Sequence, residues 1–510
     1  MKTLRLILGD QLNIDHSWFD HQEENIIYCL FETRQDTDFI RHHIQKLCAF
    51  FGAMRQFADE LRSRGHRVFY FKINDIENRQ TLTDNLNHLI EALEIEKFEY
   101  LFPDKFGLDK RLKAFCDYLS IPSRASDTEH FITERRELKD FFDGKKQFIM
   151  ESFYRHLRKK HDILMEAGQP EGGLWNYDKS NRKKWKSHHT VPVEISFNND
   201  VSEILADLKD ADVITMGRPK GQTIDYPLTR SQAIDQLDYF CEHLLVHFGD
   251  YQDAMHTGEV NLFHSRISFA LNTKILDPRT CINSAIKAFR THRETISISQ
   301  LEGFVRQILG WREYMRGMYW MFMPNYKTTN ELGHHNTLPN FYWTGKTKMN
   351  CMSHAINNSL DNAYAHHIQR LMITGNFALL NQTDPDQVDA WYLGIYADAL
   401  EWVQITNTRG MSQFADGGKI ATKPYISAAN YINKMSNYCG DCNYNNKERH
   451  TDNACPFNSL YWNFLDDKRE KLASNRRMGM VYKLLDRIPK TELEKIKDRA
   501  YQIIMNPDDY

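Results

Sequence analysis

The sequence of 510 residues lacks the long apolar runs of a membrane protein. No stretch approaches the roughly 18 consecutive apolar residues that predict a membrane-spanning helix. At the N-terminus, MKTLRLILGDQLN has an apolar stretch of about five residues, which is too short for a signal-peptide core and is typical of a first strand. With neither kind of segment, we expect a cytoplasmic protein with no membrane partner.

The sequence also lacks internal repeats, low-complexity segments and a strong charge imbalance. Its formal net charge is -3, so the chain as a whole is not suited to polyanions, although DNA binding needs only a local basic patch. No Gly-x-Gly-x-x-Gly motif follows a strand-like run, which argues against a standard dinucleotide site. Nine cysteines in a reducing compartment argue against a disulfide framework and favour metal binding or chance.

The spacing of apolar residues predicts an α/β domain followed by an all-α domain. A chain of this length is expected to form two or three domains. In residues 1–130, strand-like runs alternate with a helical pattern over residues 40–61, which is typical of a doubly wound parallel sheet. Residues 131–228 are irregular and are interpreted as an interdomain connection, and residues 229–510 show mainly helical patterns. The strand-like runs are 4–8, 26–31, 68–73 and 100–102.

The clearest helical pattern is FVRQILGWREYMRGMYW, residues 304–320. Large apolar side chains recur there every three or four residues, so they share one face of a helix. Three arginines of the same stretch fall off that face. The apolar residues are Phe304, Ile308, Trp311, Met315 and Tyr319, and the arginines are Arg306, Arg312 and Arg316.

Polar residues follow the first two predicted strands. Parallel sheets bind ligands beyond the carboxyl ends of their strands, and Asp10, Phe31 and Glu32 lie at two such ends. Helix capping and loop solvation explain the two carboxylates equally well.

Three cysteines near the C-terminus have the spacing C-x2-C-x12-C, and Pro456 follows the last of them. Zinc and iron–sulfur clusters both require four soft ligands, so one ligand must come from elsewhere. Cys351 opens a helical stretch in the same domain and is the best candidate, whereas His450 is a rival that would favour zinc. The spacing alone leaves zinc and a cluster open. The three closely spaced ligands are Cys439, Cys442 and Cys455.

A basic stretch surrounds Trp185 in the predicted connection. Such a stretch is commonly a solvated face, but basic side chains around an aromatic ring also suit a phosphate contact. Its members include Lys179, Arg182, Lys183 and Lys184.

Two segments of the helical part resemble the photolyases and cryptochromes. GEVNLFHSRISFALN, residues 258–272, resembles their T-S-R-L-S segment around the FAD phosphates, with a histidine in place of threonine. Hydroxyls, an arginine and backbone amides are the groups that a diphosphate needs. QILGWREYMRG resembles their L-I-W-R-E-F-Y-R segment, with Gly310 as a departure. The positions carried over are His264, Ser265, Arg266, Ile267, Ser268, Trp311, Arg312 and Glu313.

Two later segments extend the resemblance. AYAHHIQRLMITGNFALL resembles the I-H-H-L-A-R segment of (6-4) photolyases and places His366 and His367 on its paired histidines. A histidine of near-neutral pKa is well suited to supply a proton, although the start of a helix explains such a pair too. WYLGIYADALEWVQITNTRGMSQFADGG resembles the segment beneath the isoalloxazine ring, with Asp398 and Gln404 as candidates for the flavin edge.

Nearly the whole chain resembles the iron–sulfur bacterial cryptochromes and photolyases, also called prokaryotic (6-4) photolyases. This resemblance implies FAD, a [4Fe-4S] cluster on the four cysteines rather than zinc, and a 6,7-dimethyl-8-ribityllumazine antenna near Asp10, Phe31 and Glu32. It also implies Mg2+ near the DNA site, for which Asp178 is the candidate. An aromatic electron path is implied too, although core packing is the simpler explanation for any single tryptophan. Its members would be Trp391, Tyr392 and Trp343.

The function implied by the resemblance is light-driven DNA repair by a lyase that acts as a monomer. Excited reduced FAD gives an electron to a flipped-out (6-4) photoproduct, His366 donates a proton, and His367 holds the geometry. One alternative is a blue-light photoreceptor without repair activity, and another is an iron–sulfur nucleic-acid binder similar to the primase large subunit. The residues expected to hold phosphates of UV-damaged DNA are Lys179, Arg182, Lys183, Lys184, Arg476 and Arg477.

Overall fold

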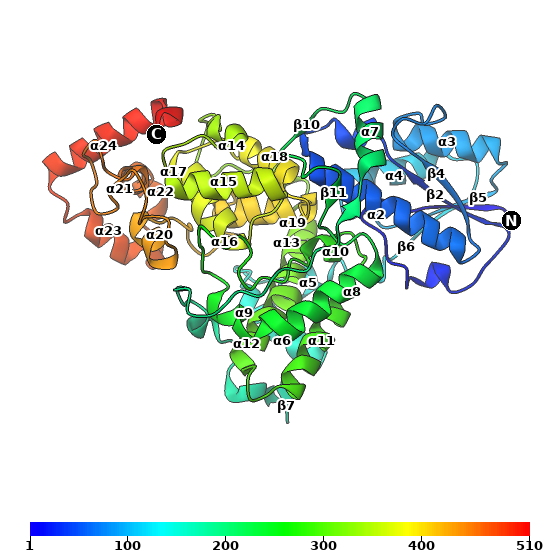
Figure 1. The fold of residues 1–510 in the computed structure, drawn as a ribbon, viewed down its shortest axis with the longest axis horizontal. Coiled ribbons are helices and arrows are strands. Elements are labelled where there is room, and N and C mark those ends of the chain that lie inside the picture. Colours follow the sequence, from blue (N-terminus) through cyan, green and yellow to red (C-terminus); the bar gives the residue numbers. More distant parts are fainter.

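The computed structural model describes residues 1–510, and its N-terminal part is built on a five-stranded parallel sheet (Figure 1). The strand order is β4-β2-β1-β5-β6, so the chain winds in both directions from β1, and the predicted doubly wound sheet is confirmed. The strands are β1 (Thr3–Leu6), β2 (Ile26–Phe31), β4 (Arg67–Phe71), β5 (Lys97–Leu101) and β6 (Ser123–Ser126).

Helices cover both faces of this sheet. Strand β2 is apolar and buried over its whole length, as expected for a central strand of a parallel sheet. Ile27 and Cys29 pack in a small core with α3 and α4, whereas Tyr28 and Leu30 join the main core with α2. The helices of this part are α1 (Arg34–Thr37), α2 (Ile44–Ser63), α3 (Leu82–Ala92) and α4 (Phe106–Tyr118).

Residues 131–228 form several short elements that pack on both neighbouring parts. Helix α7 lies against α2, where Ile204 and Leu228 approach Gly52 so closely that a side chain at Gly52 would collide with Leu228. Helix α6 packs against the helical part. The elements are α5 (Glu137–Phe141), α6 (Met150–Lys160), α7 (Ser202–Asp210), and the strand pairs β7 (Met165–Glu166) with β8 (Gln169–Pro170), β9 (Asn199–Asp200) with β11 (Thr223–Ile224), and β10 (Thr215–Met216) with β3 (His42–His43).

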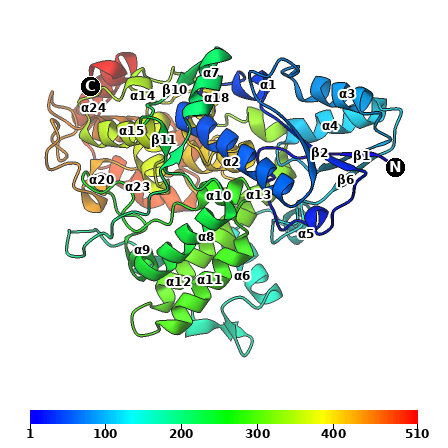
Figure 2. The ribbon, with the colours of Figure 1, turned by 45° about the vertical axis from the view of Figure 1, so that its right-hand side comes forward.

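Helices make up the rest of the chain, and the C-terminus lies at the end of the molecule opposite the sheet (Figures 1 and 2). Four π-helical turns, η4, η5, η7 and η8, continue neighbouring helices. No helix is both long and apolar enough to cross a bilayer. The helices and π turns are α8 (Arg230–Tyr239), η4 (Phe240–Leu244), α9 (Leu245–Tyr251), α10 (Ser268–Asn272), α11 (Pro278–Thr291), α12 (Ile298–Val305), η5 (Arg306–Arg312), α13 (Glu313–Phe322), α14 (Phe341–Thr344), α15 (Asn350–Asn362), α16 (His367–Gln369), η7 (Arg370–Gly375), α17 (Asn376–Leu380), α18 (Pro385–Ile395), α19 (Glu401–Ile405), η8 (Thr406–Ser412), α20 (Ala429–Met435), α21 (Pro456–Asp467), α22 (Arg469–Leu472), α23 (Gly479–Leu485) and α24 (Lys490–Met505).

The predicted helix over residues 304–320 is the continuous run α12–η5–α13. Its apolar face is buried, except that Trp311 is only half-buried. The three arginines off that face are buried as well, because each finds polar partners inside the protein. Arg306 lies near Glu302, Arg312 donates to the carbonyl of Leu271, and Arg316 donates to a carbonyl of the connection.

Candidate functional site

Four cysteines that are far apart in the sequence meet around one cavity. The lining of the cavity includes Cys351, Cys439, Cys442 and Cys455 but not His450. Cys351 lies in the first turn of α15, and Cys455 is the residue before α21, which begins with Pro456. No three or more His, Cys, Asp or Glu side chains form a group that could hold a metal ion. The four thiols line one cavity although Cys351 lies far from the other three in the sequence.

The surrounding protein favours the neutral form of Cys439 and Cys455. Burial, with a smaller contribution from the nearby Cys442, raises the pKa of Cys439 to about 11. Burial likewise raises the pKa of Cys455 to about 12, with Cys442 and Cys439 adding to the effect. Thiolates are the ligands of soft metals, so ionising this set requires a positive centre inside the cavity.

The paired histidines differ sharply in their surroundings. His366 is buried, with 2% of its surface exposed, and its ring stacks on that of His264 with centroids 4.7 Å apart and planes inclined by 13°. Burial, followed by the neighbouring imidazoles, lowers the pKa of His366 well below the ordinary range. His367 is exposed, yet desolvation by the surrounding protein, followed by the positive charge of Arg370, lowers its pKa to about 4. His367 is therefore the member of the pair that lies open to an incoming ligand.

Asp398 is the centre of a buried ion-pair network beside the histidines. Its carboxylate accepts two hydrogen bonds from the Arg370 guanidinium, at 2.9 and 3.1 Å, and one from Ser268 Oγ at 2.7 Å. Burial raises the pKa of Asp398, but Arg370, Ser268 and Lys46 together outweigh burial and leave that pKa below its ordinary value. Lys46 of α2 donates to the carbonyls of Leu393 and Ala399, the latter being the residue after Asp398.

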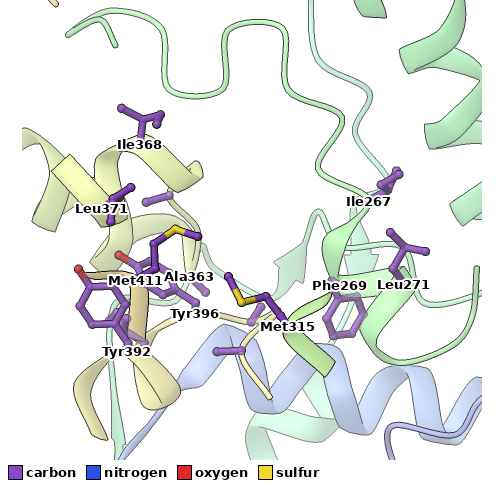
Figure 3. Packing of buried hydrophobic residues seen from close by; sticks show 14 of the residues in the cluster. Ile267, Phe269, Leu271, Met315, Ala363, Ile368, Leu371, Tyr392, Tyr396 and Met411 are labelled. Carbon is purple, nitrogen blue, oxygen red and sulfur yellow. The ribbon is translucent and has the colours of Figure 1, made fainter. Parts of the chain in front are cut away.

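The structure thus joins two predicted flavin segments through Ser268 and Asp398, and it adds two residues that the sequence reasoning missed. Arg370 follows the paired histidines by three residues, so its place in the same segment was a usable signal. Lys46 had no such signal, because it lies in the other domain. Figure 3 shows buried apolar side chains of the same two segments, with Ile267, Phe269 and Leu271 on the right of the view and Tyr392, Tyr396 and Met411 on the left.

The other predicted flavin contacts form bonds within the protein. Arg266 donates to Glu194 Oε2 at 2.7 Å, and Gln404 donates to Thr408. Ser265 and Trp311 are half-buried. Arg312 lies at the junction with the α/β domain, where it donates to His130 and to the carbonyl of Leu271, both at 3.0 Å, and packs over two aromatic rings. Arg312 thus joins the two domains.

Aromatic rings in contact lead from α14 to the network around Asp398. The ring of Tyr342 lies 5.1 Å from that of Trp391, which in turn lies 5.2 Å from that of Tyr392. The Tyr392 hydroxyl donates to the carbonyl of Arg370 at 2.6 Å. Trp343 is 41% exposed and follows Tyr342 in α14. The structure thus brings Trp391 and Tyr392 into one run with Tyr342, and Trp343 is joined to this run through the backbone.

The predicted antenna residues have different surroundings. Both carboxylate oxygens of Glu32 are engaged, by Arg55 at 2.8 and 3.0 Å, by the Tyr70 hydroxyl, and by a backbone amide. Glu32 therefore anchors Arg55 and has no free oxygen to offer a ligand, which does not support its predicted antenna contact. Phe31 is buried against Phe71. Asp10 lies near Lys274, which donates to its carbonyl oxygen, and burial raises the pKa of its carboxyl.

The two basic stretches predicted to bind DNA lie near each other. Burial and Asp178 raise the pKa of Tyr425, whereas Arg182 of one stretch and Arg477 of the other lower it. The two arginines therefore both lie near Tyr425. Arg477 and its neighbour Arg476 are exposed. Lys179 is exposed, Lys183 pairs with Asp250, and Lys184 donates to the carbonyl of Asn433.

Trp185 does not present its ring to a ligand. It is 6% exposed and packs edge-to-face on His256. Its role within the basic stretch is therefore to fix the loop. Close by, burial raises the pKa of Asp253 to about 6, and the neighbouring carboxylate of Asp178 raises it further, so two acidic groups share this place.

Comparisons with known proteins agree on one family. The model of the family described as "Deoxyribodipyrimidine photo-lyase-related protein" matches residues 5–223. A (6-4) photolyase of Agrobacterium fabrum is 40% identical over 513 positions, which cover 100% of both chains. The fold is similar to that of a bacterial class III photolyase from Agrobacterium tumefaciens, with a TM-score of 0.59, 13% identity, and coverage of 99% of this chain and 98% of that one. It is also similar to a Synechocystis cryptochrome, with a TM-score of 0.58, 11% identity, and coverage of 97% and 93%. The chain therefore belongs to the photolyase family that includes the Agrobacterium (6-4) photolyase.

Proposed function

We propose that this protein repairs (6-4) photoproducts in DNA by light-driven electron transfer. The observation that carries the proposal is the 40% identity to a (6-4) photolyase over the whole of both chains. When bound, reduced FAD would supply the electron upon illumination. The residues described above then have to bind the flavin, admit the lesion and supply a proton.

The flavin would lie between the segment of Ser268 and that of Asp398 and Arg370. These three side chains form a buried network of donors and acceptors, which suits a polar cofactor held away from water. His264 and His366 fit the same place, since each has a buried ring nitrogen without a hydrogen-bond partner. The run from Trp343 to Tyr392 would carry electrons from the surface when the flavin is reduced.

The proton donor is better assigned to His367 than to His366, which was the assignment from the sequence. A donor must come within hydrogen-bonding distance of the lesion, and solvent reaches His367 while His366 is buried against His264. In this arrangement His366 holds the turn from which His367 extends. Because its pKa is lowered to about 4, His367 is neutral at pH 7 in the free protein, so the bound lesion and its phosphates would have to favour the protonated form before His367 donates.

The four cysteines would hold a [4Fe-4S] cluster. A single zinc ion would draw four sulfurs to roughly 3.8 Å from one another, given bonds of about 2.3 Å. Four thiols that line one cavity supply the soft ligands that either metal centre requires. The resemblance to the iron–sulfur photolyases favours the cluster, which carries its irons at separate corners and so binds four thiolates that stand farther apart. Because the cavity joins α15 to two distant loops, the cluster would stabilise the fold.

Two further ligands are proposed. A 6,7-dimethyl-8-ribityllumazine antenna would bind beyond the strand ends near Asp10 and Phe31, without Glu32. Mg2+ would bind at Asp178 beside the buried carboxyl of Asp253, since hard cations prefer carboxylate oxygens, and it would there replace Arg182 and Arg306, which now pair with the two oxygens of Asp178. The exposed arginines 476 and 477 and the basic loop would contact DNA phosphates on either side of the lesion.

The test is illumination of the purified protein with an oligonucleotide that carries one defined (6-4) photoproduct. A matched oligonucleotide with a cyclobutane dimer at the same position is the control. We expect the (6-4) lesion to disappear and the dimer to persist. Repair of the dimer alone would refute the substrate assignment, and flavin photoreduction without any repair would favour the photoreceptor alternative.

A further inference from the structure

Tyr438 links the cysteine cavity to helix α15. It precedes Cys439, and like Cys351 of α15 it lines the cavity. Asn350 donates to the Tyr438 carbonyl at 2.8 Å, and the ring of His354 stacks on that of Tyr438 with centroids 5.7 Å apart and 17° between the planes. One tyrosine therefore adjoins one cysteine and is packed against the helix that carries another.

The hydroxyl of Tyr438 extends this link to the histidines. It accepts a hydrogen bond from Gln369 Nε2 at 3.0 Å, and Gln369 Oε1 accepts one from Asn358 Nδ2 of α15, also at 3.0 Å. These three side chains are 1%, 3% and 8% exposed. No bulk water replaces a partner lost at such depth, so each bond strongly restricts the position of the next group.

Gln369 is the last residue of α16, whose first residue is His367 and whose N-cap is His366. Helix α16 is the first turn of a run that continues through η7, and Gln369 lies in that turn two residues after His367, so a displacement of Gln369 is passed directly to the histidines. We propose that Tyr438, acting through Gln369, is a positioning residue that couples the cysteine cavity to the placement of His367. This inference rests on the proposed function for the role of His367. The coupling works in both directions, because an interaction between two sites changes both equally.

The experiment compares Tyr438→Phe with Tyr444→Phe in the full-length protein. Tyr444 also lines the cavity, but its hydroxyl makes no hydrogen bond to α16, so it is a matched control. Cluster and FAD absorbance should be retained in both variants. Hydrogen–deuterium exchange over residues 364–375 should rise in Tyr438→Phe only, and its single-turnover repair rate should fall about tenfold, as expected for a displacement well below 1 Å.

A second variant, Gln369→Met, removes the donor of the hydrogen bond between Gln369 and the Tyr438 hydroxyl. The effects of Tyr438→Phe and Gln369→Met on exchange should be less than additive, because both break one interaction. Equal exchange over residues 364–375 in Tyr438→Phe, Gln369→Met and the wild type would overturn the inference. The exchange measurement needs no repair, so a wild-type protein that fails to repair the (6-4) lesion would defeat the proposed function separately.

Discussion

Replacing Asp398 by asparagine should strongly destabilise the helical domain. Asp398 is the only carboxylate that pairs with the Arg370 guanidinium, and only 11% and 16% of the two side chains are exposed. The variant leaves Arg370 charged and buried without its partner. Breaking a buried pair in this way costs about 3–5 kcal/mol in the free energy of unfolding.

The matched control is Asp361→Asn, which breaks an ion pair at the surface. Asp361 lies 2.6 Å from Arg218, but the two side chains are 46% and 48% exposed. Water solvates both charges after the change, so the expected cost is about 0–1 kcal/mol. Urea titration followed by tryptophan fluorescence at pH 7 measures both variants, and flavin absorbance per protein measures cofactor retention. Asp398→Asn should also lose FAD, whereas Asp361→Asn should keep it.

The effect of Asp398 also has a defined pH dependence. Its pKa in the folded protein lies below the ordinary value of 3.8, so the folded state favours the charged form. The resulting stabilisation is fully present above that value and is lost as the pH falls through the folded-state pKa. The difference between wild type and Asp398→Asn should therefore be constant from pH 7 to 5 and shrink below about pH 4. A loss of under 1 kcal/mol at pH 7, or a difference that grows on acidification, would refute the reasoning.

Four further predictions concern other parts of the molecule. Cys351→Ser should lose the broad brown absorbance of the cluster and much of the soluble yield, and a normal spectrum would show that the fourth ligand lies elsewhere. Trp391→Phe should retain FAD but slow its photoreduction at least tenfold, measured as bleaching at 450 nm under blue light; an unchanged rate would exclude the run from Trp343 to Tyr392 as the main path. Arg476→Ala with Arg477→Ala should weaken binding to damaged and undamaged DNA alike and reduce the salt slope by about two, since each contact releases about one counterion. His43 is buried and its pKa is lowered to about 4, so the unfolded state binds more protons below pH 6.5; His43→Gln should remove up to about 3 kcal/mol of the stability lost between pH 7 and 4, seen in urea titrations.

Local sequence patterns were sufficient to predict those elements that have the same kind of surroundings along their whole length. Strand β2 was predicted with the bounds that the structure has, because a central strand is apolar on both faces. Three of the four cysteines could be predicted from their spacing, and Cys351, chosen because it opens a helical stretch in the same domain, lines the same cavity. The helix over residues 40–61 was found a few residues early, and Gly65, with a φ of +86°, lies just beyond its end.

Elements that depend on distant partners could not be predicted. Strand β6, with the sequence SRAS, is short and polar, since it lies at the edge of the sheet and only the pairing with β5 makes it a strand. Burial of Arg306, Arg312 and Arg316 depends on acceptors up to about 200 residues away. The sequence around Glu32 does not indicate that Arg55 is its partner, because Arg55 approaches Glu32 only once α2 has packed on the sheet.

The contacts of helix α2 show that the α/β domain completes the proposed flavin site. Lys46 is buried, and burial lowers its pKa to about 7, yet its ammonium is held by the carbonyls of Leu393 and Ala399 on either side of Asp398. His43, one turn earlier, donates from Nε2 to the carbonyl of Leu360 in α15. Helix α2 thus fixes two segments of the helical domain, those of Asp398 and of the cysteine helix. Because those carbonyls would lose buried donors without it, separating residues 1–130 from the rest should cost the helical domain its flavin as well as its antenna.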